Sequence, residues 1–143
     1  MLPQLIAAQC ILTPPENYGD MVVLASQEFE IDPRVLSSIV NQETKCMHSA
    51  VGAQGEIGLV QLHPGVWSNP YNLNWIKTSL NWPDLSYAQD PYQNLRAGAW
   101  VLSVNLKLSG GDLHTALKLY NGASAYADKV LADHTLYWDG CEP

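Results

Sequence analysis

The chain has few basic residues and no cluster of them. Its 143 residues include seven Lys and Arg against 14 Asp and Glu, so the formal net charge is −7. The basic residues are scattered, whereas nucleic-acid-binding proteins gather Lys and Arg to contact phosphates. The sequence therefore argues against a nucleic-acid partner, and its acidic balance is more typical of a surface that keeps a protein in solution.

Cysteine is also scarce, with only Cys10, Cys46 and Cys141. None of them belongs to a C-x-x-C pair or a Cys/His cluster, so a zinc site is not expected. A metal held by His48, His63 and a carboxylate would lack a recognised ligand spacing. We therefore predict no metal and no other cofactor. One disulfide with a free thiol, and three free thiols, are both compatible with the sequence.

No hydrophobic run is long enough to cross a bilayer. The apolar start, residues 1–12, is short, is interrupted by Pro3 and lacks the basic region of a signal peptide. We expect it to pack on the domain, with no integral membrane segment and no clear signal peptide. Hydrophobic residues make up 47% of the chain, and its length suffices to bury a real core. A single domain over residues 1–143 is predicted.

What the sequence does contain is helical periodicity. Asp32 with Pro33, and Asp90 with Pro91, are typical helix starts, while glycines mark several helix ends. Such patterns cover residues 22–31, 33–45, 90–109, 112–121 and 123–134. Residues 46–57 resemble a loop, residues 58–64 a short helical or extended piece, and residues 65–89 a mostly irregular stretch with one short helix. No convincing strand pair is present, so the predicted class is mainly α.

Two carboxylates, Glu43 and Glu56, flank the glycine-containing loop. Glu43 falls in the last turn of the predicted helix 33–45 and continues an apolar strip formed by Leu36, Ile39 and Val40. A helix C-terminus and an apolar neighbourhood both disfavour the charged form. A raised pKa is what a general acid needs near neutral pH. A surface carboxylate without a chemical role is the other interpretation, and the residues alone leave both open.

Other catalytic arrangements have less support. A Ser/His/Asp triad would lack the G-x-S-x-G elbow, and a Cys46/His pair has no supporting motif. The rings of residues 65–89 are mostly expected in the core, with one or two free to line a groove for sugar faces.

Four segments, in this order, resemble the SLT-type lytic transglycosylases, which are relatives of goose-type lysozyme. They are "VLSSIVNQET", "SAVGA", "GLVQLHP" and "ALKLYNGASA", and "DPYQNLRAGAWVL" is similar to a further helix of that family. The match extends over residues 31–129. The resemblance implies a mainly α, lysozyme-like fold of the SLT and goose-type kind, with a saccharide-binding groove.

The resemblance also implies roles for individual residues. Glu43 matches the family's single catalytic acid/base, and Tyr120 matches a tyrosine that lies close to the catalytic carboxyl group. Glu56 falls in a loop that is longer than the family pattern, and His63 stands where methionine is frequent. The residues predicted to bind substrate are Thr44, Ser49, Glu56, Gln61, His63, Tyr120 and Asn121.

The implied function is cleavage of the β-1,4 bond between MurNAc and GlcNAc in peptidoglycan, with formation of 1,6-anhydro-MurNAc by one carboxyl group. Two alternatives stay open. If Glu56 lies near Glu43 and holds a water molecule, the protein would be a goose-type-like muramidase that hydrolyses the same bond. A protein that only kept the groove would be a non-catalytic peptidoglycan-binding module.

The expected partner is the glycan strand of bacterial peptidoglycan. For a transglycosylase, the short length and the absence of a clear signal peptide favour a bacteriophage protein, either an endolysin or a virion component. They argue against an enzyme of a secretion or conjugation system. The protein would act in the periplasm or at the cell wall, and other virion proteins would be its further partners.

Overall fold

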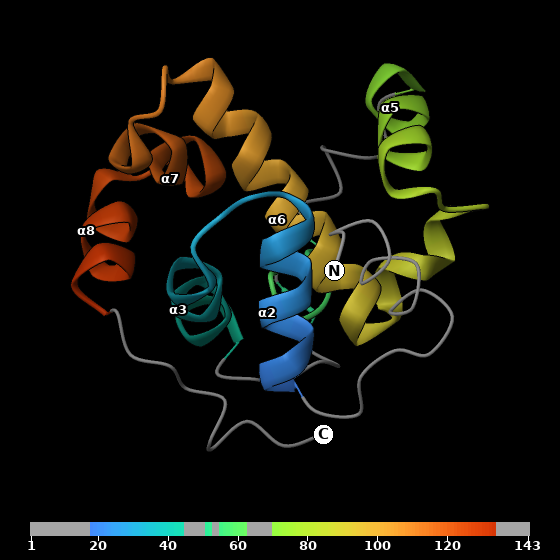
Figure 1. Ribbon diagram of the computed structural model, residues 1–143, viewed down its shortest axis with the longest axis horizontal. Coiled ribbons are helices and arrows are strands. Elements are labelled where there is room, and N and C mark those ends of the chain that lie inside the picture. Colours follow the sequence, from blue (N-terminus) through green and yellow to red (C-terminus); the bar gives the residue numbers. More distant parts are fainter. Residues whose placement is uncertain (1–17, 45–50, 53–54, 63–69, 134–143) are drawn as a thin grey trace.

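The computed structural model describes residues 18–44, 51–52, 55–62 and 70–133 (Figure 1). These residues confirm the mainly α prediction, since they pair as extended chain only in two isolated bridges, between Val51 and Ile57 and between Ile57 and Leu62. The elements in chain order are α2 (Tyr18–Glu28), α3 (Pro33–Thr44), α5 (Pro70–Leu80), the 3-10 helix η1 (Leu85–Gln89), α6 (Pro91–Leu108), α7 (Leu113–Asn121) and α8 (Ser124–Ala132).

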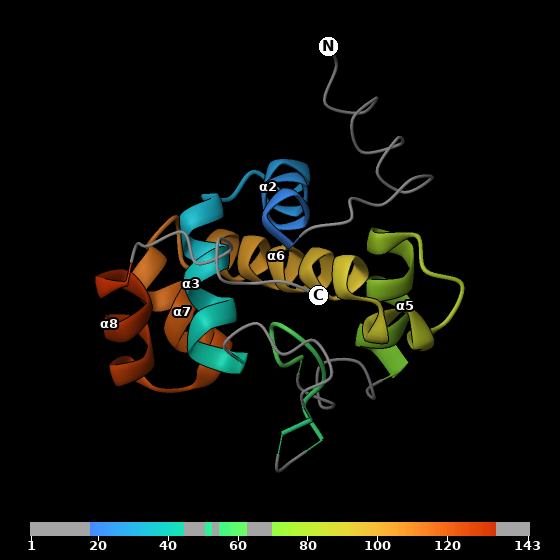
Figure 2. The same cartoon turned by 90° about the horizontal axis from the view of Figure 1, so that it is seen from below.

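Helix α6 runs through the middle of the molecule, with α2, α3, α5, α7 and η1 in contact with it (Figures 1 and 2). Its start is as predicted, because the Asp90 carboxylate accepts a hydrogen bond of 3.0 Å from the Gln93 backbone N–H. Its end is also as predicted, because Gly110 and Gly111 follow with positive φ angles of 64° and 90°. The described residues share one hydrophobic core, to which α6 contributes Leu95, Ala99 and Leu102, all fully buried. The prediction of one domain over residues 1–143 stays a prediction.

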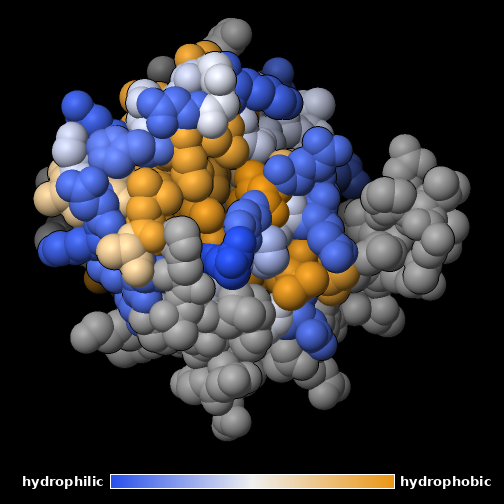
Figure 3. Space-filling view, turned by 60° about the vertical axis from the view of Figure 1, so that its left-hand side comes forward, coloured by the Kyte–Doolittle hydropathy of each residue, from blue (hydrophilic) through white to orange (hydrophobic). Residues whose placement is uncertain are grey.

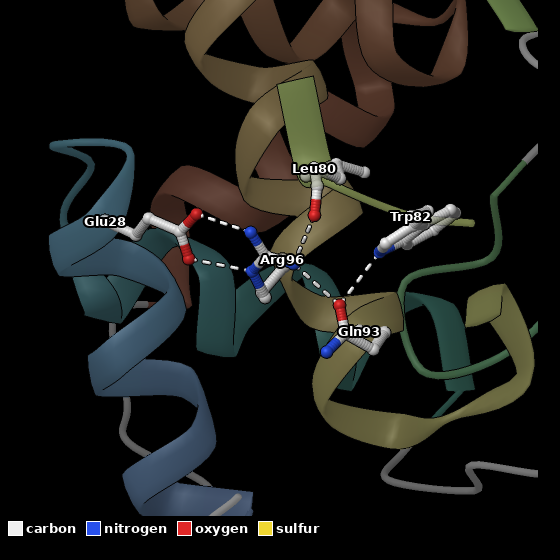
Figure 4. A network of polar contacts seen from close by, with 5 residues as sticks. All are labelled: Glu28, Leu80, Trp82, Gln93 and Arg96. Carbon is white, nitrogen blue, oxygen red and sulfur yellow. Dashed lines mark hydrogen bonds and ion pairs between the residues drawn. The ribbon is translucent and has the colours of Figure 1, made fainter. Parts of the chain in front are cut away.

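An ion pair between the buried Arg96 and the partly buried Glu28 joins α2 to α6 (Figure 4). The Arg96 guanidinium donates to both carboxylate oxygens of Glu28, at 2.8 and 2.7 Å. It also donates to the Leu80 carbonyl at 2.8 Å and to the Gln93 side chain at 2.7 Å. The Trp82 indole N–H donates to the same Gln93 oxygen at 2.8 Å. This network ties α2 and the end of α5 to the first half of α6, where an unpaired charge would be costly.

The prediction that residues 65–89 are mostly irregular was wrong. An 11-residue helix, α5, and the 3-10 helix η1 fall in this region. Helix α5 is held by Ile76 and Leu80, which lie one turn apart and are both buried in the core. Their signal was hidden because polar Asn, Thr and Ser residues surround them. Residues 58–61 belong to the stretch that was predicted to be a short helical or extended piece. They form a tight turn.

Several predictions concern residues outside the described ranges. All three cysteines lie there, so their disulfide state is not tested. The apolar segment 1–12 lies there too. Among the described helices, none is long and apolar enough to span a membrane. Figure 3 shows one face of the molecule, on which hydrophobic residues gather between hydrophilic ones.

Candidate active site

Glu43 lies in the last turn of α3, and its neighbour Thr44 ends the helix. The buried Thr44 hydroxyl donates to the Leu59 carbonyl at 2.9 Å, and the Val40 carbonyl is 3.2 Å away. The end of α3 is thereby fastened to the turn at residues 57–62. Glu43 is partly buried, and it directly precedes the residue that makes this connection.

Asn94 of α6 holds the same turn from the other side. Its side-chain oxygen accepts the Val60 N–H at 3.0 Å, and its amide N–H groups donate to the carbonyls of Ile57 at 3.0 Å and Ala88 at 2.9 Å. The Asn94 side chain is 1% exposed. A buried amide with three such bonds fixes the turn rigidly relative to α6.

Two glycines allow this close approach. At Gly58, which has φ +79°, a Cβ would stand 2.4 Å from the Asn94 amide nitrogen. At Gly98, one turn further along α6, a Cβ would stand 2.7 Å from a methyl group of Val60. Neither position has room for a side chain, so the turn can lie directly on α6.

Two tyrosines complete the surroundings of Glu43. The Tyr120 hydroxyl, from α7, donates to the Val60 carbonyl at 2.9 Å. The ring of Tyr126, from α8, stacks on Tyr120 with the ring centroids 6.4 Å apart and the planes 7° from parallel. Burial raises the pKa of both phenols, and the negative charge of Glu43 raises it further. The negative charge of Glu43 therefore acts on both phenol groups.

The carboxyl group of Glu43 has an unusual proton affinity. Burial raises its pKa from 4.5 to about 7, and the negative charge of Glu56 contributes to the rise. Desolvation disfavours the charged form, and a second carboxylate nearby does the same. Glu43 thus holds its proton into the neutral range, as expected from its place on an apolar strip.

Glu56 lies beside Gly52 and Gln61 in the loop that follows α3. A Cβ on Gly52 would stand 2.0 Å from a Glu56 carboxylate oxygen and 2.7 Å from the Gln61 side-chain oxygen. The other Glu56 carboxylate oxygen is buried and has no hydrogen-bond partner among the described residues. The Gln61 amide donates to the Gly58 carbonyl at 3.0 Å, and Gln61 has a positive φ of 50°. A strained backbone of this kind is frequent at functional sites.

The predicted site residues fall into three groups. The structure brings Glu43, Thr44, Glu56, Gln61 and Tyr120 to the turn at residues 57–62 and its surroundings. Asn121 is exposed at the end of α7. Ser49 and His63 lie outside the described residues. Contact of these residues with substrate stays a prediction, and the buried Thr44 hydroxyl is engaged with the protein backbone.

Sequence reasoning missed Asn94 and Tyr126. Asn94 belongs to "DPYQNLRAGAWVL", which resembles a helix of the family, but nothing local shows that its side chain holds a distant turn. Tyr126 follows the matched motif and carries no local signal of its own.

A shallow hollow of about 510 Å³ lies elsewhere, around Trp75 and Trp100 of α5 and α6. These two rings meet edge to face, with centroids 5.0 Å apart. None of the predicted site residues lines this hollow. In the part of the chain that the structure describes, no three His, Cys, Asp or Glu side chains gather as metal ligands would.

Comparison with known proteins assigns the family. The family model described as "Transglycosylase SLT domain" matches residues 20–134. The chain belongs to this family. A curated relative of the SLT-domain chain, the transglycosylase of Enterobacteria phage PRD1, is 32% identical to it over 112 residues. The alignment covers 78% of this chain and 37% of the relative, so the chain spans well under half of the phage protein's length.

A solved structure shares the fold of the SLT-domain chain. It is an inactive mutant of the lytic transglycosylase Slt from Pseudomonas aeruginosa, with a TM-score of 0.71 and 18% sequence identity. The match covers 90% of this chain and 25% of that one. The predicted lysozyme-like fold is confirmed, and the identity is too low for this likeness to show more than the fold.

Proposed function

We propose that this SLT-domain chain is a peptidoglycan lytic transglycosylase in which Glu43 is the only acid/base. It would cleave the β-1,4 bond between MurNAc and GlcNAc and leave a 1,6-anhydro-MurNAc end. The observation that carries the proposal is the Glu43 carboxyl group, with its pKa raised to about 7, at the junction of α3, the turn at residues 57–62 and two tyrosines.

The reaction needs one carboxyl group that first gives and then takes a proton. Protonated Glu43 donates to the glycosidic oxygen as the bond to the MurNAc anomeric carbon breaks, and GlcNAc leaves as an alcohol. The acetamido oxygen of MurNAc stabilises the positive charge that develops on the sugar. The Glu43 carboxylate then removes the proton of the MurNAc 6-hydroxyl, whose oxygen bonds to the anomeric carbon. Glu43 ends protonated, and no water is consumed.

A pKa of about 7 suits both halves of this cycle. A group whose pKa lies near the working pH is a usable acid and a usable base, whereas an ordinary glutamic acid would already be ionised. Neither a metal nor a cofactor has a role in these steps.

Hydrolysis by the same residues is the second candidate, and one observation favours it. Glu56 lies near enough to Glu43 to affect its pKa, and one of its carboxylate oxygens is buried without a partner among the described residues. A carboxylate in that position can hold and activate a water molecule, as in glycosidases with two carboxyl groups.

Mass spectrometry of the products separates the two reactions. Purified peptidoglycan is digested with the protein, and the muropeptides are examined for anhydro and reducing MurNAc ends. The proposal expects anhydro ends. Digestion in water enriched in ¹⁸O sharpens the result, because hydrolysis places solvent oxygen on the new reducing end and the transglycosylase reaction does not. Reducing, labelled ends alone would show that the protein is a muramidase.

A protein that binds the wall without cutting it would release no fragments in this digest. Binding without release, measured by pull-down with insoluble peptidoglycan, would identify a non-catalytic module.

The phage relative supports a role at the bacterial wall during infection, either in lysis or in the virion, where other virion proteins would be partners. Mass spectrometry of purified virions would find the protein only if it is a virion component.

A further inference from the structure

The stacked phenols of Tyr120 and Tyr126 differ in whether their hydroxyl group already donates a hydrogen bond. A phenol has a single O–H donor. The Tyr120 proton is directed to the Val60 carbonyl, 2.9 Å away. Tyr120 can therefore offer only its oxygen lone pairs to another group.

Tyr126 has its donor available. Its side chain is 9% exposed, and its hydroxyl oxygen is buried without a hydrogen-bond partner among the described residues. Leaving a buried hydroxyl unpaired is unfavourable, and such groups are rare in native proteins. The Tyr126 ring is fixed by its stack on Tyr120, and α8 is held to α3 by the Ser38 hydroxyl, which donates to the Val130 carbonyl at 2.9 Å.

The charge that Glu43 acquires has no cationic partner among the described residues. Among the described residues, the Glu56 carboxylate in the loop after α3 acts on Glu43, and the charge of Glu43 acts in turn on the phenols of Tyr120 and Tyr126 on α7 and α8. On α3 itself, the amides of Asn41 and Gln42 are directed to the Asp133 carboxylate after α8. A neutral hydrogen-bond donor is then the remaining means of stabilising the carboxylate.

We propose that the Tyr126 hydroxyl donates a hydrogen bond to the Glu43 carboxylate once Glu43 has given its proton to the glycosidic oxygen, an inference that rests on the acid/base role proposed above. Tyr126 keeps its own proton throughout. It is a positioning residue that stabilises the ionised form of Glu43 between the two proton transfers, whereas Tyr120 holds the turn through Val60.

Tyr126→Phe tests this directly, because it removes the hydroxyl and keeps the stacked ring. The pKa of Glu43 is measured without substrate, from the pH dependence of its side-chain carboxyl signal in protein labelled with ¹³C-glutamate, with Glu43→Gln assigning the signal. We expect the pKa of Glu43 to rise in Tyr126→Phe by about one unit, since the charged form loses a donor. The pH at which activity declines on the alkaline side should rise by the same amount. At the same time kcat should fall about tenfold, with little change in KM.

Tyr18→Phe is the matched control, because Tyr18 is also buried, at 2% exposed, but lies on α2. It should leave the pKa of Glu43 and the activity profile unchanged. An unchanged or lowered pKa of Glu43 in Tyr126→Phe would overturn the inference. So would a lower melting temperature of Tyr126→Phe at a pH where Glu43 is protonated, because the hydroxyl would then have another partner.

Failure of the proposed function is distinguishable from failure of this inference. If Glu43→Gln keeps its activity while Tyr126→Phe raises the pKa of Glu43, the hydrogen bond from Tyr126 is supported and the acid/base role of Glu43 is refuted. If Glu43→Gln is inactive while the pKa of Glu43 does not respond to Tyr126→Phe, the role of Glu43 stands and that of Tyr126 falls.

Discussion

The Glu56 carboxylate lies near enough to Glu43 for its negative charge to add to the rise that burial produces in the Glu43 pKa. Glu56 is thirteen residues further along the chain, at the far end of a loop. Its effect is to keep Glu43 protonated, which is the form that starts either reaction. The two carboxylates are therefore electrostatically coupled, whichever of the two proposed reactions takes place.

Glu43→Gln should abolish cleavage of peptidoglycan. The amide keeps the shape of the side chain but has no proton to give, so we expect a loss of about 10²- to 10⁴-fold in the rate of muropeptide release. Circular dichroism should show an unchanged helix content. Glu30→Gln, which changes an exposed carboxylate just after α2, is the control and should retain full activity. Substantial activity in Glu43→Gln would refute the assignment.

Glu56→Gln should shift the pH dependence of the reaction without removing it. Loss of the Glu56 charge lowers the pKa of Glu43, so the decline in activity with rising pH should begin at a lower pH than in the wild type. Activity at acidic pH should be preserved. A collapse of activity across the whole pH range would instead favour the muramidase, in which Glu56 activates water.

Glu43→Gln should also change how stability depends on pH. The unfolded chain ionises Glu43 at about its ordinary pKa of 4.5, whereas the folded protein keeps the proton until about pH 7. The free energy of unfolding therefore falls as pH rises through this window and levels off above it. Above pH 7 the variant should be more stable than the wild type by on the order of 1–3 kcal/mol, allowing for solvent screening at a partly exposed group.

Below pH 4.5 Glu43 is protonated in both states, so the gain from Glu43→Gln should vanish there. Urea unfolding at a series of pH values measures the difference. A gain that is equal at all pH values would mean that Glu43 has an ordinary pKa in the folded protein.

Asn94→Ala should loosen the turn at residues 57–62. It leaves the Val60 N–H and the carbonyls of Ile57 and Ala88 without their partner, so the free energy of unfolding should fall by about 2–4 kcal/mol. Activity should fall as well, because this turn positions Thr44 and Tyr120. Asn105→Ala is the control: its amide donates one bond of 3.3 Å to the Ala116 carbonyl, so its effect should be smaller. Equal effects would argue against the special role of Asn94.

Gly98→Ala should destabilise the protein although alanine favours helices. The new Cβ would stand 2.7 Å from a Val60 methyl group, and relief of such a contact requires α6 and the turn to separate. We expect the close contact to destabilise the protein by about 1–3 kcal/mol, whereas the higher helix propensity of alanine stabilises it by about 1 kcal/mol. Because Val60→Ala removes the opposing methyl groups, the double variant should be less destabilised than the sum of the two single variants. Additive effects would show that the two residues do not meet.

Local sequence patterns determined most of the helical framework. Helix α3 begins at Pro33 and ends at Thr44, α6 begins after Asp90, and α7 ends before Gly122, all as capping residues and apolar spacing predict. These signals act within one or two turns, so they can be recognised in the sequence alone. They also place Glu43 on an apolar strip at a helix end, which is why its raised pKa could be foreseen.

Only the tertiary structure decided what surrounds Glu43. The Val60 backbone is held by Asn94, 34 residues away, and by Tyr120, 60 residues away. No periodicity or capping rule connects positions so distant. The nearness of Glu56, the stack of Tyr126 on Tyr120 and the stability of α5 depend on such packing. The sequence by itself thus determined the ends of α3, α6 and α7 that carry capping signals, and it placed Glu43 on an apolar strip at a helix end. The packing of the turn against α6 and α7 determined that its neighbours are Glu56, Tyr120 and Tyr126, because side chains meet there only once distant segments have been brought together.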